Sequence, residues 1–109
     1  MNQSEFLVTV GFAQGTVLSG AIPAAPSGLV AAGTFAEIQV DWTNNASYDS
    51  LVFERQIDAG VWEPIVVTPE QASYIDHPID DGSYTYRIHG VVNGVSSATV
   101  VSNTLVIEE

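Results

Sequence analysis

The sequence contains no cysteine and no lysine. Its 109 residues include two arginines, Arg55 and Arg87, against 13 acidic residues, and the formal net charge is −11. Without cysteine the chain has no disulfide framework, no cysteine–zinc site and no thiol nucleophile. Two arginines cannot neutralise a track of phosphates or hold a protein on anionic lipid. The sequence therefore predicts neither a nucleic-acid partner nor a membrane partner.

Long hydrophobic runs are also absent. No apolar stretch approaches the ~18–20 residues needed to span a bilayer. The segment 6–12 is apolar, but Glu5 precedes it, no basic residue flanks it, and Thr9 and Gly11 interrupt it. These features are not typical of a secretory signal. If Met1 is native, we therefore expect the protein to be made and folded in a cytoplasm.

Helical periodicity is the third absence. Short segments with alternating apolar residues recur instead, separated by Gly, Asn, Asp, Ser or Pro, and this pattern is typical of an antiparallel all-β sandwich. The expected strands are 28–32, 37–42, 50–57, 61–67, 73–76, 83–92 and 102–108. The alternation is clearest in 83–92, where Tyr84, Tyr86 and Ile88 face one way. Asn93-Gly94 suits the tight turn after that strand, because both residues tolerate positive φ.

Several segments from residue 23 onward resemble the fibronectin type III domain, and they occur in that family's order. They are 25–29, 38–42, 53–55, 60–62, 74–76 and 80–88. The resemblance implies a seven-stranded antiparallel β-sandwich over residues 23–109, with Tyr84 as a tyrosine corner whose hydroxyl bonds to upstream backbone. The expected core residues are Trp42, Phe53, Tyr84, Tyr86 and Ile88.

Residues 1–22 lie outside that resemblance and are predicted to form an extra N-terminal β arm. Phe6, Val8, Val10 and Phe12 alternate at period two, which gives the arm a wholly apolar face. A lone hairpin is marginal in water, and a flat apolar edge invites pairing with another strand. The arm residues expected to contact a partner are Phe6, Leu7, Val8, Val10, Phe12, Val17 and Leu18.

Three placements of this arm are open. It extends an edge of its own sheet, it adds as a strand to a neighbouring protein in a homo-oligomer or larger assembly, or it is disordered. Disorder is disfavoured because the composition is too apolar for a free tail. We favour attachment to a neighbour.

The residues capable of chemistry are few. His77 and His89 lack the spacing of metal ligands. Asp76, Asp80 and Asp81 cluster at one end and are the type of oxygen ligand that holds Ca²⁺, but no calcium-loop pattern surrounds them, so we expect a solvated turn. No serine, aspartate or histidine occupies a recognised catalytic setting. The sequence therefore predicts no catalytic residue, no cofactor and no metal site.

Two side-chain groupings bear on ligand binding. Tyr48, Trp62 and Tyr74 would form a sugar-stacking platform if all three were exposed on one face. The family resemblance implies that Trp62 packs partly against the sheet, which makes a carbohydrate ligand the weaker expectation. Glu54 and Arg87 are expected to pair across adjacent strands, a contact that contributes only ~0.2–1 kcal/mol.

These observations favour a non-catalytic structural or interaction protein. The adhesion motif Arg-Gly-Asp is missing, because neither arginine is followed by glycine. The absence of an export signal favours a phage virion accessory protein, on the head or the tail, assembled in the host cytoplasm. The alternative is an accessory or spacer module of a secreted bacterial enzyme or surface protein, with carbohydrate as a ligand. The fold alone does not choose between them.

Overall fold

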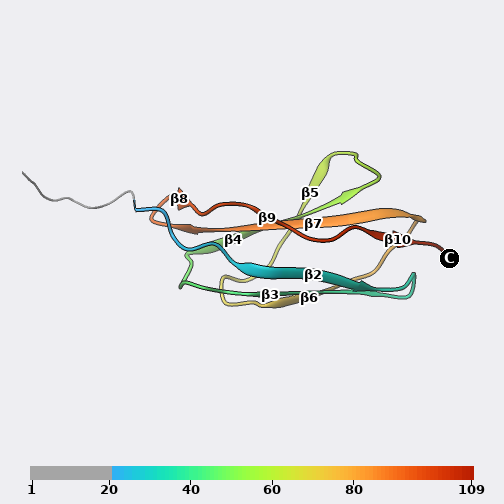
Figure 1. Cartoon of the computed structure of the whole chain (residues 1–109), viewed down its shortest axis with the longest axis horizontal. Helices are drawn as coiled ribbons and strands as arrows, with labels where there is room; N and C mark the ends of the chain where they lie inside the picture. Colours follow the sequence, from blue (N-terminus) through green and yellow to red (C-terminus); the bar gives the residue numbers. More distant parts are fainter. Residues whose placement is uncertain (1–20) are drawn as a thin grey trace, which may run out of the picture.

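The computed structural model describes residues 21–109, which fold into two stacked antiparallel sheets with no helix (Figure 1). One sheet has the order β2-β3-β6. The other has the order β10-β7-β4-β5, with β8 and β9 also paired to β7. The strands are β2 (Ser27–Gly33), β3 (Ile38–Thr43), β4 (Ser50–Ile57), β5 (Trp62–Ile65), β6 (Ser73–Asp76), β7 (Gly82–Val92), β8 (Val95–Ser96), β9 (Val100–Val101) and β10 (Leu105–Ile107). The expected all-β sandwich is confirmed.

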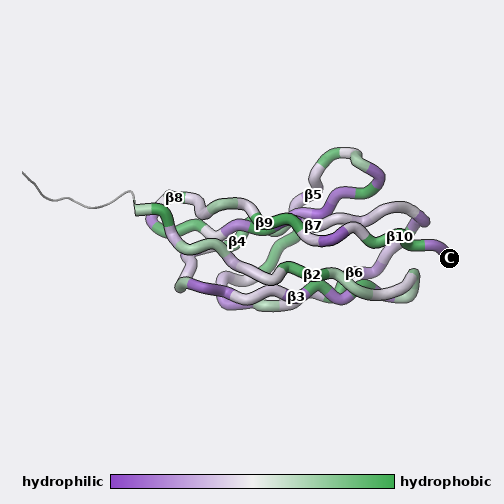
Figure 2. Tube along the Cα trace, in the orientation of Figure 1, coloured by the Kyte–Doolittle hydropathy of each residue, from purple (hydrophilic) through white to green (hydrophobic). Residues whose placement is uncertain are grey.

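Period-two alternation builds the core. In β3 every second residue is buried, and in β7 the buried residues alternate with partly exposed ones. Hydrophobic and hydrophilic residues both occur along the trace of each sheet (Figure 2). Phe53 lies at the centre, with its ring centroid 5.2 Å from that of Trp42, 5.6 Å from that of Tyr74 and 5.8 Å from that of Tyr86. Ile88 and Tyr84 are buried in the same cluster.

The last strand differs from the prediction of one strand over 102–108. Three short pieces, β8, β9 and β10, pair in turn with β7. The paired residues are Val92 with Val95, Ile88 with Val100, and Tyr84 with Leu105. Each step of four residues along β7 is therefore matched by five along its partner, so one extra residue is accommodated at each step, as in a β-bulge.

Serine hydroxyls make these two interruptions stable. The backbone N–H groups of Ser97 and Ser102 donate to the carbonyls of Gly90 and Tyr86, each at 2.8 Å. Their Oγ atoms accept from the N–H groups of the same two residues, at 3.0 and 2.9 Å. The side chain thus replaces the carbonyl that a regular strand would offer, and no buried donor of β7 is left unpaired at these points.

The two long sides of the sandwich differ. On one side, Asn103 joins the two sheets: its Nδ2 donates to the Ala31 carbonyl, and its Oδ1 accepts from the Ala31 N–H, each at 2.9 Å. On the other side, the edge strands are β5 and β6. The prediction of a strand over 61–67 was too long, because β5 ends at Ile65 and the chain then leaves the sheet. We call this second side the open side.

Candidate interaction surfaces

One end of the sandwich holds the chain where it enters the fold. We call this end the N-terminal pole, and it is formed by residues 21–26, the loops 44–49 and 66–72 and the turn 93–94. The Tyr48 hydroxyl donates to the Ala24 carbonyl at 2.6 Å. Asn45 Nδ2 donates to the Ala25 carbonyl at 2.9 Å and contacts Ser27 Oγ at 3.0 Å. Residues 24–27 are therefore held against the loop 44–49. The predicted arm residues, Phe6 to Leu18, lie outside the described part of the chain.

Tyr48 can take this position because Gly90 has no side chain. The Tyr48 side chain is only 7% exposed, and its ring lies against the backbone of Gly90 in β7. A Cβ atom on Gly90 would overlap the ring. The glycine is therefore required by close packing and not by an unusual backbone angle.

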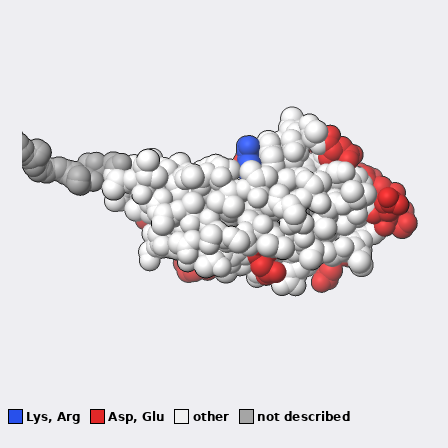
Figure 3. All heavy atoms as spheres, in the orientation of Figure 1, with Lys and Arg blue, Asp and Glu red and all other residues white. Residues whose placement is uncertain are grey.

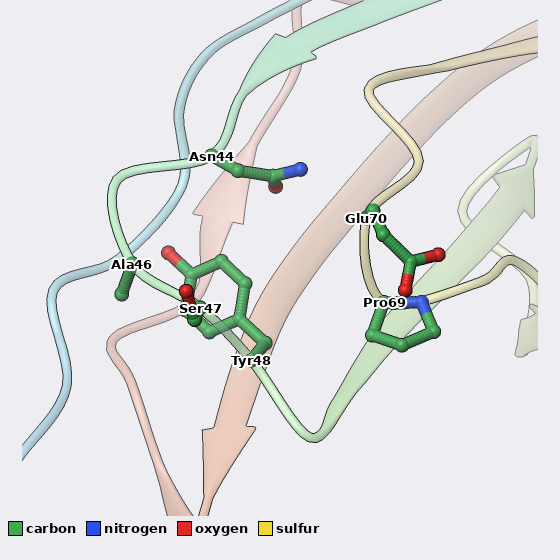
Figure 4. Close-up of a pocket in the computed structure, with 6 residues that line it drawn as sticks. All are labelled: Asn44, Ala46, Ser47, Tyr48, Pro69 and Glu70. Atoms are coloured by element: carbon green, nitrogen blue, oxygen red, sulfur yellow. The ribbon is translucent and has the colours of Figure 1, made fainter.

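A groove of about 360 Å³ opens at this pole (Figure 4). It lies between the loop 44–49 and the segment that carries Pro69 and Glu70. Asn44 links its two walls, because it accepts a bond from Trp42 Nε1 at 3.1 Å and donates to the Gln71 carbonyl at 3.0 Å. Glu70 is the one charged residue in the lining, beside the hydroxyl-bearing residues Ser47 and Tyr48. The groove therefore offers a small, partly polar contact surface.

The opposite end of the sandwich, which we call the C-terminal pole, is acidic. It is formed by the turns 34–37, 58–60 and 77–81 and the last residues of the chain, and acidic side chains gather there in Figure 3. Its acidic residues are Glu37, Asp58, Asp80, Asp81, Glu108 and Glu109, six of the 13 in the sequence. Within residues 21–109 no group of acidic or histidine side chains has the arrangement of a metal site.

Asp76 is not part of a solvated turn, and that prediction was wrong. It is 3% exposed at the end of β6. Both carboxylate oxygens accept from Arg55 Nη1, at 2.9 and 3.1 Å, and Oδ2 also accepts from the Tyr86 hydroxyl at 2.6 Å. Because Arg55 is on β4 and Tyr86 on β7, this network joins the two sheets. Glu63 Oε1 lies 2.9 Å from Arg55 Nη2 at the exposed end.

The network shifts the titration of its members. Burial disfavours the charge of Arg55, but hydrogen bonds to Glu63 and Asp76 outweigh that effect and raise the pKa of the guanidinium. Burial raises the pKa of Tyr86, and the hydrogen bond to Asp76 raises it further. Burial also raises the pKa of Tyr84. Both phenols therefore keep their protons in the folded protein at pH values where a free tyrosine ionises.

We expect the free energy of unfolding to fall as the pH rises above ~10. Tyrosines of the unfolded chain lose their protons near that pH, whereas Tyr84 and Tyr86 retain theirs, so the unfolded state binds fewer protons and is favoured. Urea unfolding measured at a series of alkaline pH values checks this, and Tyr86→Phe should flatten the slope. Tyrosinate absorbance from Tyr86 in the intact fold at pH ~10 would contradict the assignment.

The three aromatic residues of the sugar platform do not share one exposed face. Tyr48 is buried, and Tyr74 packs edge-on against Phe53. The ring of Trp62 is covered by Arg87, whose guanidinium carbon lies 4.2 Å from the ring centroid. Arg87 Nε donates to Glu54 Oε1 at 2.7 Å, so the cross-strand pair is formed as expected. Both arginines are thus held by acidic partners.

Comparisons with known proteins are informative for structure only. No family model matches the sequence, and a comparison with curated proteins finds no match. Among solved structures, the sandwich is similar to titin kinase with its flanking domains (TM-score 0.63, 14% identity, 80% of this chain and 17% of that chain). It is also similar to a Fn3-like protein from Clostridium thermocellum (0.58, 21%, 81% and 94%) and to FN3tt (0.61, 14%, 81% and 97%).

The match to the last two structures covers 81% of this chain and 94% and 97% of theirs, so nearly all of each neighbour is matched. The chain has the fibronectin type III fold. The tyrosine corner of that fold is present, because the Tyr84 hydroxyl donates to the Asp80 carbonyl four residues upstream at 2.7 Å. This chain spans 17% of the titin structure, so that protein's activity does not carry over to it.

The fibronectin type III fold does not by itself assign a function, so a role has to be argued from the surfaces of this chain. In residues 21–109 no helix is long and apolar enough to cross a membrane. His89 lies on the outward face of β7, and His77 follows Asp76, whose Oδ1 accepts the His77 N–H at 3.0 Å. The surfaces that remain for a function are the N-terminal pole, the open side and the acidic C-terminal pole.

Proposed function

We propose that this protein is a non-catalytic structural protein whose residues 1–22 anchor it to a larger assembly and whose fibronectin type III sandwich is displayed. The observation that carries the proposal is the contrast between the two poles. The N-terminal pole, where the chain is clamped by Tyr48 and Asn45, carries the acidic residues Asp49 and Glu70. The C-terminal pole carries six acidic residues. A domain attached by the first pole turns the second toward solvent.

The arm itself has the composition of an attachment segment. Glu5 is its only charged residue, whereas 12 of the 13 acidic residues lie from Glu37 onward. A nearly uncharged apolar segment gains from burial against protein, whereas the acidic residues of the sandwich favour contact with water. The chain thus divides into one part suited to contact and one suited to display.

We propose a phage particle as the assembly, with the protein on its head or tail and the host cytoplasm as the place of attachment. Such particles carry small immunoglobulin-like proteins on their surfaces. A sandwich that reaches its fold without disulfide bonds suits assembly in a reducing cytoplasm. Carbohydrate is the less favoured ligand, because Tyr48, Trp62 and Tyr74 do not form a common exposed face.

Deletion of residues 1–22 should leave a folded, monomeric sandwich that no longer joins the assembly. The clamp residues Ala24 and Ala25 are retained, so the deletion removes no described hydrogen bond. The measurement is co-sedimentation with particles produced by co-expressing the chain with the products of neighbouring genes. The full chain should move with the particles, and the deleted chain should stay in the soluble fraction. Equal co-sedimentation of both chains would overturn the anchoring role.

A further inference from the structure

We propose that the open side holds a receiving site for the N-terminal arm of a second copy of this chain. This inference rests on the proposed role of residues 1–22 in attachment and names the surface that the arm enters. The site is a notch of about 260 Å³ between β4 and the end of β5. Its lining residues are Leu51, Val52, Phe53, Pro64, Ile65, Val66 and Val67.

The notch exists because the chain leaves β5 after Ile65. Beyond that residue β4 has no partner on this side, and Leu51, Val52 and Phe53 line the notch, although Phe53 itself is only 1% exposed. No residue of the lining is charged, and Val66 is 94% exposed. A valine so fully exposed beside other apolar residues gains free energy when another apolar surface covers it.

Pro64 limits the backbone hydrogen bonds that an added strand could form at this site. Proline has no backbone N–H, so the free edge of β5 cannot form a full ladder with an added strand. The notch is therefore suited to receive large apolar side chains, with only partial backbone pairing. The arm provides Phe6, Val8, Val10 and Phe12 at alternate positions, so that they share one face of a strand.

The length of chain before Ala21 allows the arm to come from a second copy. Phe12 and Ala21 are nine positions apart in the sequence, enough to extend about 30 Å beyond the sandwich. Ile22, next to the clamp, is 75% exposed and is not among the residues that line the notch. The notch adjoins the loop 66–72 of the N-terminal pole, so two copies can meet there while their acidic poles stay apart.

The test is the self-association of the full chain, measured by sedimentation over a concentration series. Val66→Asp places a charge in the notch at an exposed position, and it should weaken association at least about tenfold. Val61→Asp is the matched control, because Val61 is 79% exposed but lies outside the notch. It should leave association unchanged. Val10→Asp in the arm should act like Val66→Asp.

Mixing the Val66→Asp and Val10→Asp variants tests the notch and the arm separately. Val66→Asp retains a working arm and Val10→Asp retains a working notch, so the mixture should form a dimer with one of each and nothing larger. A mixture that stays monomeric, or a full chain that is monomeric throughout, overturns the inference. A further outcome is a full chain that is monomeric and still co-sediments with particles, while the chain lacking residues 1–22 does not. In that case the anchoring proposal holds and only the arm–notch contact between copies is overturned.

Discussion

Replacing Asp76 by alanine is expected to lower the free energy of unfolding by about 3–5 kcal/mol. The substitution leaves the partly buried guanidinium of Arg55 with only the exposed Glu63, and it removes the acceptor of the Tyr86 hydroxyl. A guanidinium between two packed sheets that has lost its buried partner and keeps only an exposed one is strongly destabilising in a small domain. Urea unfolding followed by tryptophan fluorescence measures the loss.

Two variants separate charge from packing at this site. Glu63→Ala removes the other partner of Arg55, but that carboxylate is exposed, so the loss should stay below about 1 kcal/mol. The double variant Arg55→Met, Asp76→Leu removes both charges together and should recover most of the stability lost in Asp76→Ala. If the single and double variants are equally unstable, the loss comes from packing and not from the unpaired charge.

Gly90→Ala is expected to lower the free energy of unfolding by about 1–3 kcal/mol. The added Cβ atom would overlap the ring of Tyr48, which has to leave its place in the core. Displacement of the ring also breaks the bond between its hydroxyl and Ala24. We therefore expect faster proteolysis around residues 21–26 as well as a lower midpoint of urea unfolding.

Making Gly90→Ala in a second sequence background tests whether overlap with the Tyr48 ring causes the loss of stability. In a chain that already carries Tyr48→Ala, the Cβ atom introduced by Gly90→Ala has no ring to overlap, and the added substitution should change stability little. A loss of equal size with and without the Tyr48 ring would show that Gly90 is needed for its backbone freedom and not for the close approach.

The core was predictable because its pattern is local and strictly periodic. Alternation over 83–92 placed Tyr84, Tyr86 and Ile88 on one face, and the structure buries all three. The same logic applied to β4 would have found the buried ion pair. Arg55 has the same inward parity as Leu51 and Phe53, and a charge on an inward face needs a buried partner. The parity of Arg55 is thus a sequence signal for a buried acidic partner, and Asp76 is that partner.

The broken last strand was harder to predict, because a bulge depends on hydrogen bonds and not on hydrophobicity. The segments 95–99 and 100–104 both read Val-x-Ser-x-Thr, a five-residue repeat set against the two-residue period of a strand. In each, the third residue supplies the hydroxyl that replaces a carbonyl. The notch was not predictable, because 61–67 is apolar throughout much of its length and the point where it leaves β4 depends on the whole sheet.

The Asn103 link gives the sandwich a direction of mechanical strength. Residue 21 and residue 109 lie at opposite poles (Figure 1), so a pull between them runs along the strands. Asn103 holds the segment between β9 and β10 to β2 through two hydrogen bonds to Ala31. Such a pull acts on both bonds in shear, and they must break together before the sheets slide. A displayed domain that meets drag in flow would resist it along this axis.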